Sequence, residues 1–203
     1  AVRSYLRDYL DAAQRAGIHV IESPLLFGYE PLWYDAPGFE GHFHRFLEDP
    51  LPRVVSAVQD HPALLGFYSL DEPTDALRAE CEALRAAVRR SDSRHVVFCV
   101  FASRVNDWPE AYDVAGFDWY PVPGETPLIG VYHEVRRNAA IAHKSGAPLW
   151  YVPLMHIGSD MRMRSIGPAA QAAQVYLALA GGANGIVWWT WPPCHAGNWA
   201  AVK

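Results

Sequence analysis

Apolar residues along the chain follow two patterns in turn, short continuous runs and longer segments with helical spacing. The runs are rich in β-branched and aromatic residues and predict buried strands, whereas the spaced segments predict amphipathic helices. Six strands are expected at 18–23, 63–70, 95–102, 113–121, 148–158 and 185–191. Helices are expected at 2–17, 50–61, 74–92, 128–146 and 168–182, with a short helical piece at 108–112.

The segment 24–46 breaks this alternation because it is rich in Pro, Gly and aromatic residues. Its composition predicts an irregular loop, and loops of this length in compact domains commonly carry function. At the start of the 74–92 segment, Thr74 or Asp75 is placed to cap the helix.

Strands separated by helices, and apolar throughout, indicate a parallel sheet covered by helices. Either a doubly wound sheet or a (β/α)8 barrel fits this order, but the chain has neither GxGxxG nor a P-loop motif. Polar and aromatic residues instead follow the strands, where barrels build their active sites. We therefore expect an α/β fold of the (β/α)8 type, with candidate site residues Glu22, Tyr68, Asp71, Glu72, Asp118, Trp119, Tyr120, His156, Trp189 and Trp191.

The number of predicted strands is smaller than a complete barrel requires. Six βα units correspond to the third to eighth strands of the eight-stranded template. We expect residues 1–203 to form one barrel domain that is truncated at its N-terminus. A gap closed by another chain, or an open relative of the barrel, would also fit the count.

Composition narrows the range of partners. Half of the 203 residues are hydrophobic. The formal charge is −5 and no basic stripe occurs, which argues against nucleic acid as a partner. No apolar stretch reaches the roughly 20 residues of a membrane span. The three cysteines form no CxxC pair, and the cellular compartment stays open.

Two stretches, "HPALLGFYSLDEPT" and "AGGANGIVWWTW", carry a family resemblance. They resemble the large clan of retaining glycoside hydrolases with (β/α)8 barrels, and more narrowly the bacterial barrels related to β-galactosidases and cellulases. The resemblance implies hydrolysis of O-glycosidic bonds in an oligo- or polysaccharide, without a cofactor. It covers most of the chain, from about Val2 to Trp191.

By this resemblance, Glu72 takes the general acid/base position at the end of the fourth strand. Apolar strand walls disfavour a charged carboxylate, which helps an acid to hold a proton for a leaving oxygen. The family usually has Asn before this Glu, whereas this chain has Asp71. An anionic neighbour would make the two carboxyl groups titrate as a coupled pair.

The seventh strand departs from the family pattern. Clan members place a nucleophilic Glu near its end, but no carboxylate occurs between Trp150 and Gly158. Asp118, as a second catalytic group, or Glu22 could serve instead, with a carboxyl separation of roughly 6.5–9.5 Å suiting an inverting route. Alternatively, the chain binds carbohydrate without cleaving it, or uses different chemistry on the same scaffold.

The remaining candidates are expected to bind the substrate. Tyr68, Tyr120, Trp189 and Trp191 offer flat aromatic faces for a sugar ring, and the family uses a tryptophan of the last strand in this way. Trp119 and His156 also follow strands, although a packing role is possible for each. His42 and His44 would share one side of an extended loop, yet two histidines lack the third ligand of a metal site, so no metal is expected.

Missing strands would also leave sheet edges exposed. Unpaired edges invite pairing with another chain, which predicts self-association.

Overall fold

The computed structural model describes residues 2–24, 38–121, 126–154 and 167–189. Within them, each predicted strand is present, in the chain order β1-β2-β3-β4-β5-β6 across one sheet. The strands are β1 (Val20–Glu22), β2 (Leu64–Asp71), β3 (Val96–Ala102), β4 (Val114–Asp118), β5 (Leu149–Val152) and β6 (Gly185–Ile186). The helices are α1 (Val2–Arg15), α2 (Phe39–Glu48), α3 (Pro50–Val58), α4 (Arg78–Ser91), α5 (Ile129–Lys144) and α6 (Gly167–Gly181), with a 3-10 turn η2 (Asp75–Leu77).

The chain divides into two compact units. Unit 1 comprises Ala1–Cys99 and Trp108–Asp113, and unit 2 comprises Val100–Asp107 and Val114–Lys203. The boundary falls within β3, and each unit is described by itself. No helix in the described ranges is long and apolar enough to cross a membrane.

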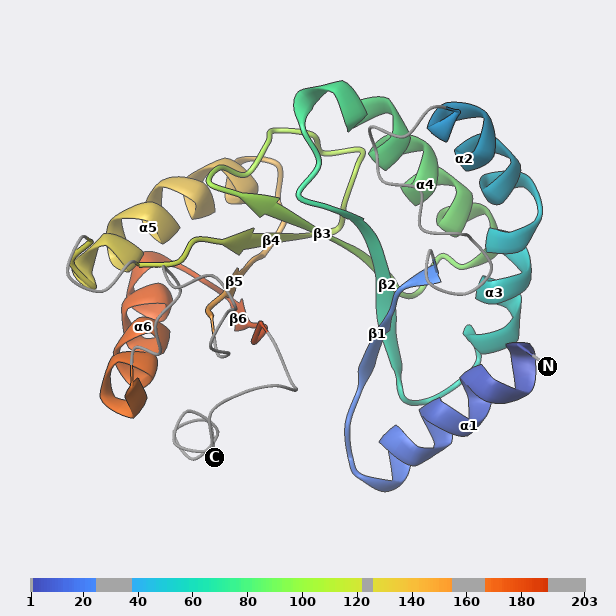
Figure 1. Ribbon diagram of the computed structural model, residues 1–203, viewed down its shortest axis with the longest axis horizontal. Helices are drawn as coiled ribbons and strands as arrows, with labels where there is room; N and C mark the ends of the chain where they lie inside the picture. The colour runs from blue at the N-terminus through green and yellow to red at the C-terminus, as the bar shows by residue number, and fades with distance from the viewer. Residues whose placement is uncertain (1, 25–37, 122–125, 155–166, 190–203) are drawn as a thin grey trace. The chain divides into compact units, whose positions relative to one another are not determined.

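In unit 1, β1 pairs with β2 in parallel, and Glu22 lies opposite Phe67. Helices α1, α2, α3 and α4 lie on one side of these two strands (Figure 1). Leu6 and Leu10 of α1 are fully buried, as the apolar spacing predicts. Gly66 is required in β2 because a Cβ atom there would lie 2.4 Å from the Val96 carbonyl oxygen.

The predicted loop 24–46 is wrong in its second part, because α2 begins at Phe39. Its buried side chains Phe39, Phe43, Phe46 and Leu47 repeat at helical spacing, and their packing outweighs the local Gly residues. A helix separates neighbouring side chains by about 100° per residue. His42 and His44 consequently lie on different faces, not on one side as predicted for an extended segment.

Two smaller predictions also differ from the structure. The short helical piece at 108–112 is a turn, closed by the Ala111 N–H bond to the Trp108 carbonyl oxygen. Thr74 precedes the 3-10 turn η2 but makes no capping bond through its side chain, and α4 starts only at Arg78.

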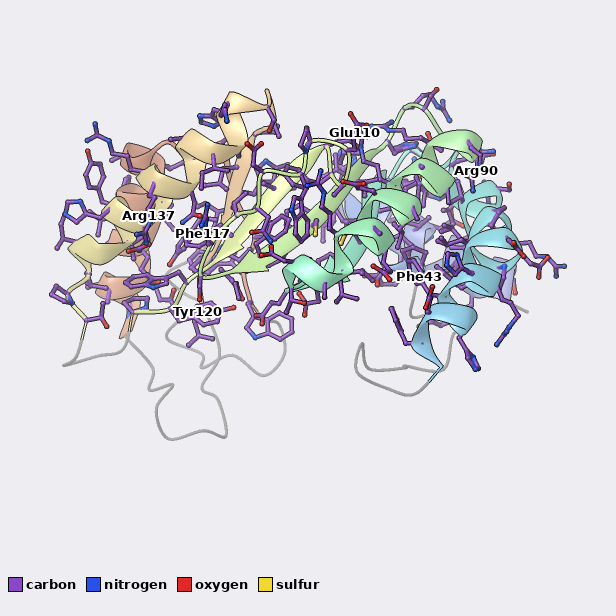
Figure 2. All side chains as sticks on the ribbon, turned by 90° about the horizontal axis from the view of Figure 1, so that it is seen from above. Phe43, Arg90, Glu110, Phe117, Tyr120 and Arg137 are labelled. Atoms are coloured by element: carbon purple, nitrogen blue, oxygen red, sulfur yellow. The ribbon has the colours of Figure 1, made fainter. Side chains whose placement is uncertain are left out.

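In unit 2, β4, β5 and β6 pair in parallel, with Asp118 opposite Val152 and Trp150 opposite Gly185. Helices α5 and α6 lie side by side, and Gly181 allows close approach to the Tyr132 carbonyl oxygen. Phe117 is buried at the sheet, whereas Arg137 extends from the surface of α5 (Figure 2). Helix α5 thus packs on β4 and β5, and α6 packs on α5.

Candidate active site

The C-terminal end of β2 carries Glu72 in a strained backbone conformation. Its φ angle is 45°, and Ser103 (φ 61°), directly after β3, is the other non-glycine residue with positive φ in the described ranges. Such conformations cost of order 1–3 kcal/mol and concentrate at functional sites. The Glu72 side chain is exposed to solvent at this turn.

Asp71, the last residue of β2, is held by Tyr68 of the same strand. The Tyr68 hydroxyl donates a hydrogen bond of 2.5 Å to Asp71 Oδ1. The surrounding protein atoms raise the pKa of Asp71 although part of its surface meets solvent, and negative Glu72 raises it further, whereas the Tyr68 bond lowers it. The net shift is upward, so Asp71 holds a proton more readily than an ordinary aspartate.

Glu22, at the end of β1, is a deeply buried acid of unit 1. Glu22 is 3% exposed, and its Oε2 atom has no hydrogen-bond partner among the described residues. Burial raises the pKa of Glu22 because the charged form loses hydration. A protonated Glu22 is therefore favoured relative to a glutamate in water.

In unit 2, Asp118 and Tyr120 form a pair at the end of β4. The Tyr120 hydroxyl donates to Asp118 Oδ2 at 3.2 Å, and Asp118 is buried. Tyr120 lies just beyond the strand (Figure 2). Together they present a carboxylate and a phenol, groups that bind sugar hydroxyls by hydrogen bonding.

The two described tryptophans among the candidates have different surroundings. A Cβ atom on Gly130 of α5 would lie 2.8 Å from the Trp119 ring, so this indole packs on the helix. Trp189 follows β6, is 48% exposed, and donates its backbone N–H to the Pro153 carbonyl oxygen. An isolated bridge also joins Trp189 to Leu154. Of these two described tryptophans, Trp189 is the more exposed, and Trp119 is partly covered by α5.

Two further candidates, His156 and Trp191, lie outside the described residues. The described part of the seventh barrel strand, Leu149–Leu154, contains no carboxylate. The family nucleophile thus has no counterpart in that part of the strand.

Sequence reasoning missed several polar groups that hold the strand ends of unit 2. These are Ser103 with its strained φ angle, and three fully buried amides, Asn138 of α5 and Gln171 and Gln174 of α6. A glutamine pair in the uncharged α6 segment was the available signal, since buried amides need specific partners. Positive φ at Ser103 leaves no such sequence signal.

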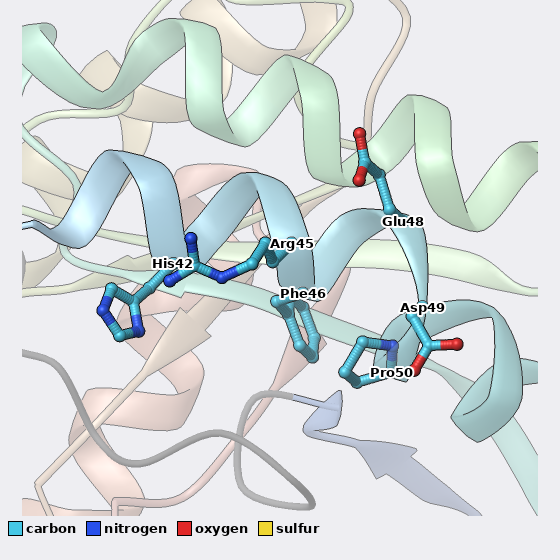
Figure 3. A pocket seen from close by; sticks show the side chains of 6 residues that line it. All are labelled: His42, Arg45, Phe46, Glu48, Asp49 and Pro50. Atoms are coloured by element: carbon cyan, nitrogen blue, oxygen red, sulfur yellow. The ribbon is translucent and has the colours of Figure 1, made fainter.

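A hollow of about 380 Å³ lies elsewhere in unit 1, at the junction of α2 and α3. Residues of α2 and of its junction with α3 line it (Figure 3): His42, Arg45, Phe46, Glu48, Asp49 and Pro50. Its lining contains none of the residues predicted from the sequence for the site. Among the described residues, no three His, Cys, Asp or Glu side chains cluster as metal ligands.

Comparisons with solved structures identify the fold. The chain is similar to a β-glucuronidase from an uncultured Clostridium sp., with a TM-score of 0.66, 15% identity, and coverage of 91% of this chain and 35% of that chain. It is similar to a Ruminococcus gnavus β-glucuronidase in complex with D-glucuronic acid (TM-score 0.62, 13% identity, 90% and 34% covered). A glycosyl hydrolase family 2 member from Bacteroides cellulosilyticus gives a TM-score of 0.57, with 15% identity and 89% and 21% covered.

These similarities confirm the predicted fold class and the structural resemblance to barrel glycoside hydrolases. Six parallel strands have the arrangement of a partial (β/α)8 barrel, and the likeness extends over about 90% of the chain. The chain spans about a third or less of the length of these solved chains. No family model matches the sequence. No curated protein matches it either.

Proposed function

We propose that this chain carries the acid/base part of a glycoside hydrolase that cleaves O-glycosidic bonds, with Glu72 as the proton donor. The observation that carries the proposal is the strained backbone of Glu72 directly after β2. The described residues leave its side chain exposed and do not enclose it between the apolar strand walls expected from the sequence. In a barrel of this class, strand C-termini are where active sites are built. The solved relatives are glycosidases, which supports carbohydrate as the substrate class.

Neighbouring groups support a role for this strand end in proton transfer. Asp71, with its raised pKa and its Tyr68 bond, places a second acid beside Glu72. Asp118 and Tyr120 are proposed to bind sugar hydroxyls at the end of β4, and Trp189 to stack on a sugar face. The stereochemical outcome is not assigned, because the seventh strand offers no carboxylate between Leu149 and Leu154.

The same missing carboxylate favours a second candidate, a carbohydrate-binding barrel without turnover. A retaining double displacement needs a nucleophile as well as an acid. A chain that kept aromatic and acidic groups but lost the nucleophile would still bind sugars. The two functions differ in turnover and not in affinity.

Kinetics of Glu72→Gln test the proposal. The variant should lose about 10²- to 10⁴-fold in kcat on alkyl glycosides, whose leaving oxygen needs a proton. It should lose far less on dinitrophenyl glycosides, because that phenolate leaves without protonation. Rates are measured by product release from both substrate types.

Asp75→Asn is the matched control, since Asp75 is an exposed carboxylate three residues further along. It should retain wild-type rates on both substrates. Equal losses on both leaving groups in Glu72→Gln would contradict a proton-donor role. Oligosaccharide binding without any turnover by the wild type would establish the binding function instead.

A further inference from the structure

Three buried amide side chains of unit 2 make polar contacts near strand ends, two of them directly with the backbone and one through a tyrosine. Asn138 Oδ1 accepts from the Val105 N–H at 2.7 Å, after β3. Gln171 Nε2 donates to the Leu154 carbonyl oxygen at 2.6 Å, after β5. Gln174 acts on the backbone after β4 indirectly, because it contacts the Tyr151 hydroxyl, which bonds to the Trp119 carbonyl oxygen. The helical layer therefore holds three consecutive strand ends by polar contacts rather than by apolar packing alone.

The contact after β4 runs through the Tyr151 hydroxyl. This group lies 2.7 Å from the Trp119 carbonyl oxygen and 3.2 Å from Gln174 Oε1, so one O–H faces two acceptors. Burial, followed by the negative charge of Asp118, raises the pKa of Tyr151 strongly. The phenol consequently keeps its proton and serves as the donor.

If Gln174 served only to fill space, its polar side chain would lower the stability of the folded protein at this position. It is fully buried, and its Nε2 has no hydrogen-bond partner among the described residues. An unsatisfied buried donor destabilises the folded state. An apolar side chain of similar length would avoid that cost, but it would leave the Tyr151 hydroxyl restrained by the Trp119 carbonyl oxygen alone.

We propose that Gln174 is a positioning residue, which fixes the Tyr151 hydroxyl and thereby the backbone that carries Asp118 and Tyr120. Trp119 lies between Asp118 and Tyr120 in the sequence. If its backbone is no longer held by Tyr151, the backbone of both neighbours becomes more mobile and their side chains move with it. The expected effect of Gln174 on sugar binding rests on the proposed function. The structural part of the inference, the restraint of residues 118–120, is measurable without any substrate.

Gln174→Met and Tyr151→Phe test this inference, with Gln14→Met, an exposed position on α1, as the control. Gln174→Met should melt at the wild-type temperature or above, because it removes an unsatisfied buried group. Amide hydrogen exchange in the segment Phe117–Tyr120 should nevertheless become at least about 5-fold faster in both variants, through local opening. Gln14→Met should change neither quantity.

In the same samples, sugar affinity or turnover should fall about 10-fold in Gln174→Met while its stability is kept, the pattern of a stability–function conflict. Unchanged exchange at Phe117–Tyr120 in Gln174→Met would overturn the inference, whatever the exchange in Tyr151→Phe. So would a lower melting temperature of Gln174→Met with exchange accelerated uniformly across unit 2, which is the signature of a purely structural residue. If the wild type neither binds nor cleaves any carbohydrate, the proposed function fails, and the exchange result still decides the positioning role.

Discussion

Individual carboxyl groups at the strand ends of unit 1 have contrasting surroundings. Glu22 is buried with an oxygen that lacks a partner, Asp71 is held by a tyrosine, and Glu72 is exposed on a strained turn. The same side-chain chemistry therefore occurs in three states within one unit. These differences come from burial and backbone geometry rather than from residue type.

Glu22→Gln should stabilise the protein at neutral pH. Burial raises the pKa of Glu22 in the folded protein above its ordinary value near 4.5. Below pH 4.5 the carboxyl group is protonated in both the folded and the unfolded state, so its burial carries no charge penalty and the folded protein has its full stability. That stability falls as the pH rises through the folded-state pKa. The variant should thus exceed the wild type in free energy of unfolding at pH 7 and match it near pH 4.

Urea unfolding at several pH values measures this difference. Glu40→Gln, an exposed acid on α2, serves as the control and should show no such pH dependence. A constant difference between Glu22→Gln and the wild type from pH 4 to pH 7 would contradict the buried-acid interpretation.

The sequence located these residues but not their states. Alternating apolar runs placed Glu22, Asp71 and Asp118 at strand ends, and the structure has them there. The positive φ of Glu72 and the bond between Tyr68 and Asp71 depend on the path of the turn, which residue patterns do not encode. The outward packing of Trp119 on Gly130 depends likewise on which face of β4 meets α5.

Between elements, Asp113 joins α4 to the starts of β3 and β4. Its carboxylate accepts bonds from Arg85 and from the Val97 N–H, and it pairs with Arg89 at 2.5 Å. Burial alone would raise the pKa of Asp113, but the bonds from Arg89, Val97 and Arg85 outweigh it and lower the pKa. The helix and the sheet are therefore linked by one largely buried charge.

Asp113→Asn should lower the free energy of unfolding by about 1.5–3 kcal/mol at pH 7, the range for hydrogen bonds to charged groups. Because the folded-state pKa is depressed, the ionic contribution is present above the ordinary pKa and is lost as the pH falls through the folded value. The difference between variant and wild type should shrink below about pH 4. Denaturant unfolding at pH 7 and at pH 3 measures it.

Asp49→Asn provides the comparison, because Asp49 pairs with Arg53 on the surface of α3. An exposed pair of this kind contributes about 0–1 kcal/mol. If both variants lose the same amount at pH 7, Asp113 has no special role in joining the elements.

Element types were predictable wherever one face of a segment was regularly apolar. The α2 helix was missed because the nearby Gly and Pro residues predicted a loop more strongly than the helical spacing of the phenylalanines predicted a helix. The polar contacts of α6 were missed because glutamine is usually exposed, so the glutamine pair in this Ala- and Leu-rich segment was not assigned to the buried face. Tertiary contacts decide such cases.

For the whole molecule, the sheet order leaves β1 and β6 at its two ends. On α1, Arg7 bonds to Ala57 and Asp60, which fixes one flank of the helix toward α3. Tyr5 and Tyr9 lie on another flank and are exposed. Among the described residues, β1 pairs with β2 alone, which leaves its other edge open. The exposed tyrosine flank of α1 is an apolar surface suited to contact with another chain.

We expect concentration-dependent self-association through this surface. The double variant Tyr5→Glu with Tyr9→Lys should reduce it, while adding a favourable i,i+4 pair that preserves α1. Light scattering over a concentration series measures the mass, with Ile129→Glu, an exposed apolar position on α5, as the control. A monomer at every concentration would contradict the prediction.

The polarity of α6 is inverted, with Gln171 and Gln174 buried while Tyr176 is 73% exposed and Leu179 also meets solvent. At about 100° per residue, Tyr176 lies on the face of the helix roughly opposite Gln174. Threading methods that reward apolar burial would accordingly penalise the orientation it adopts. In distant homologues, two glutamines three residues apart would mark the inward face of this helix better than its leucines.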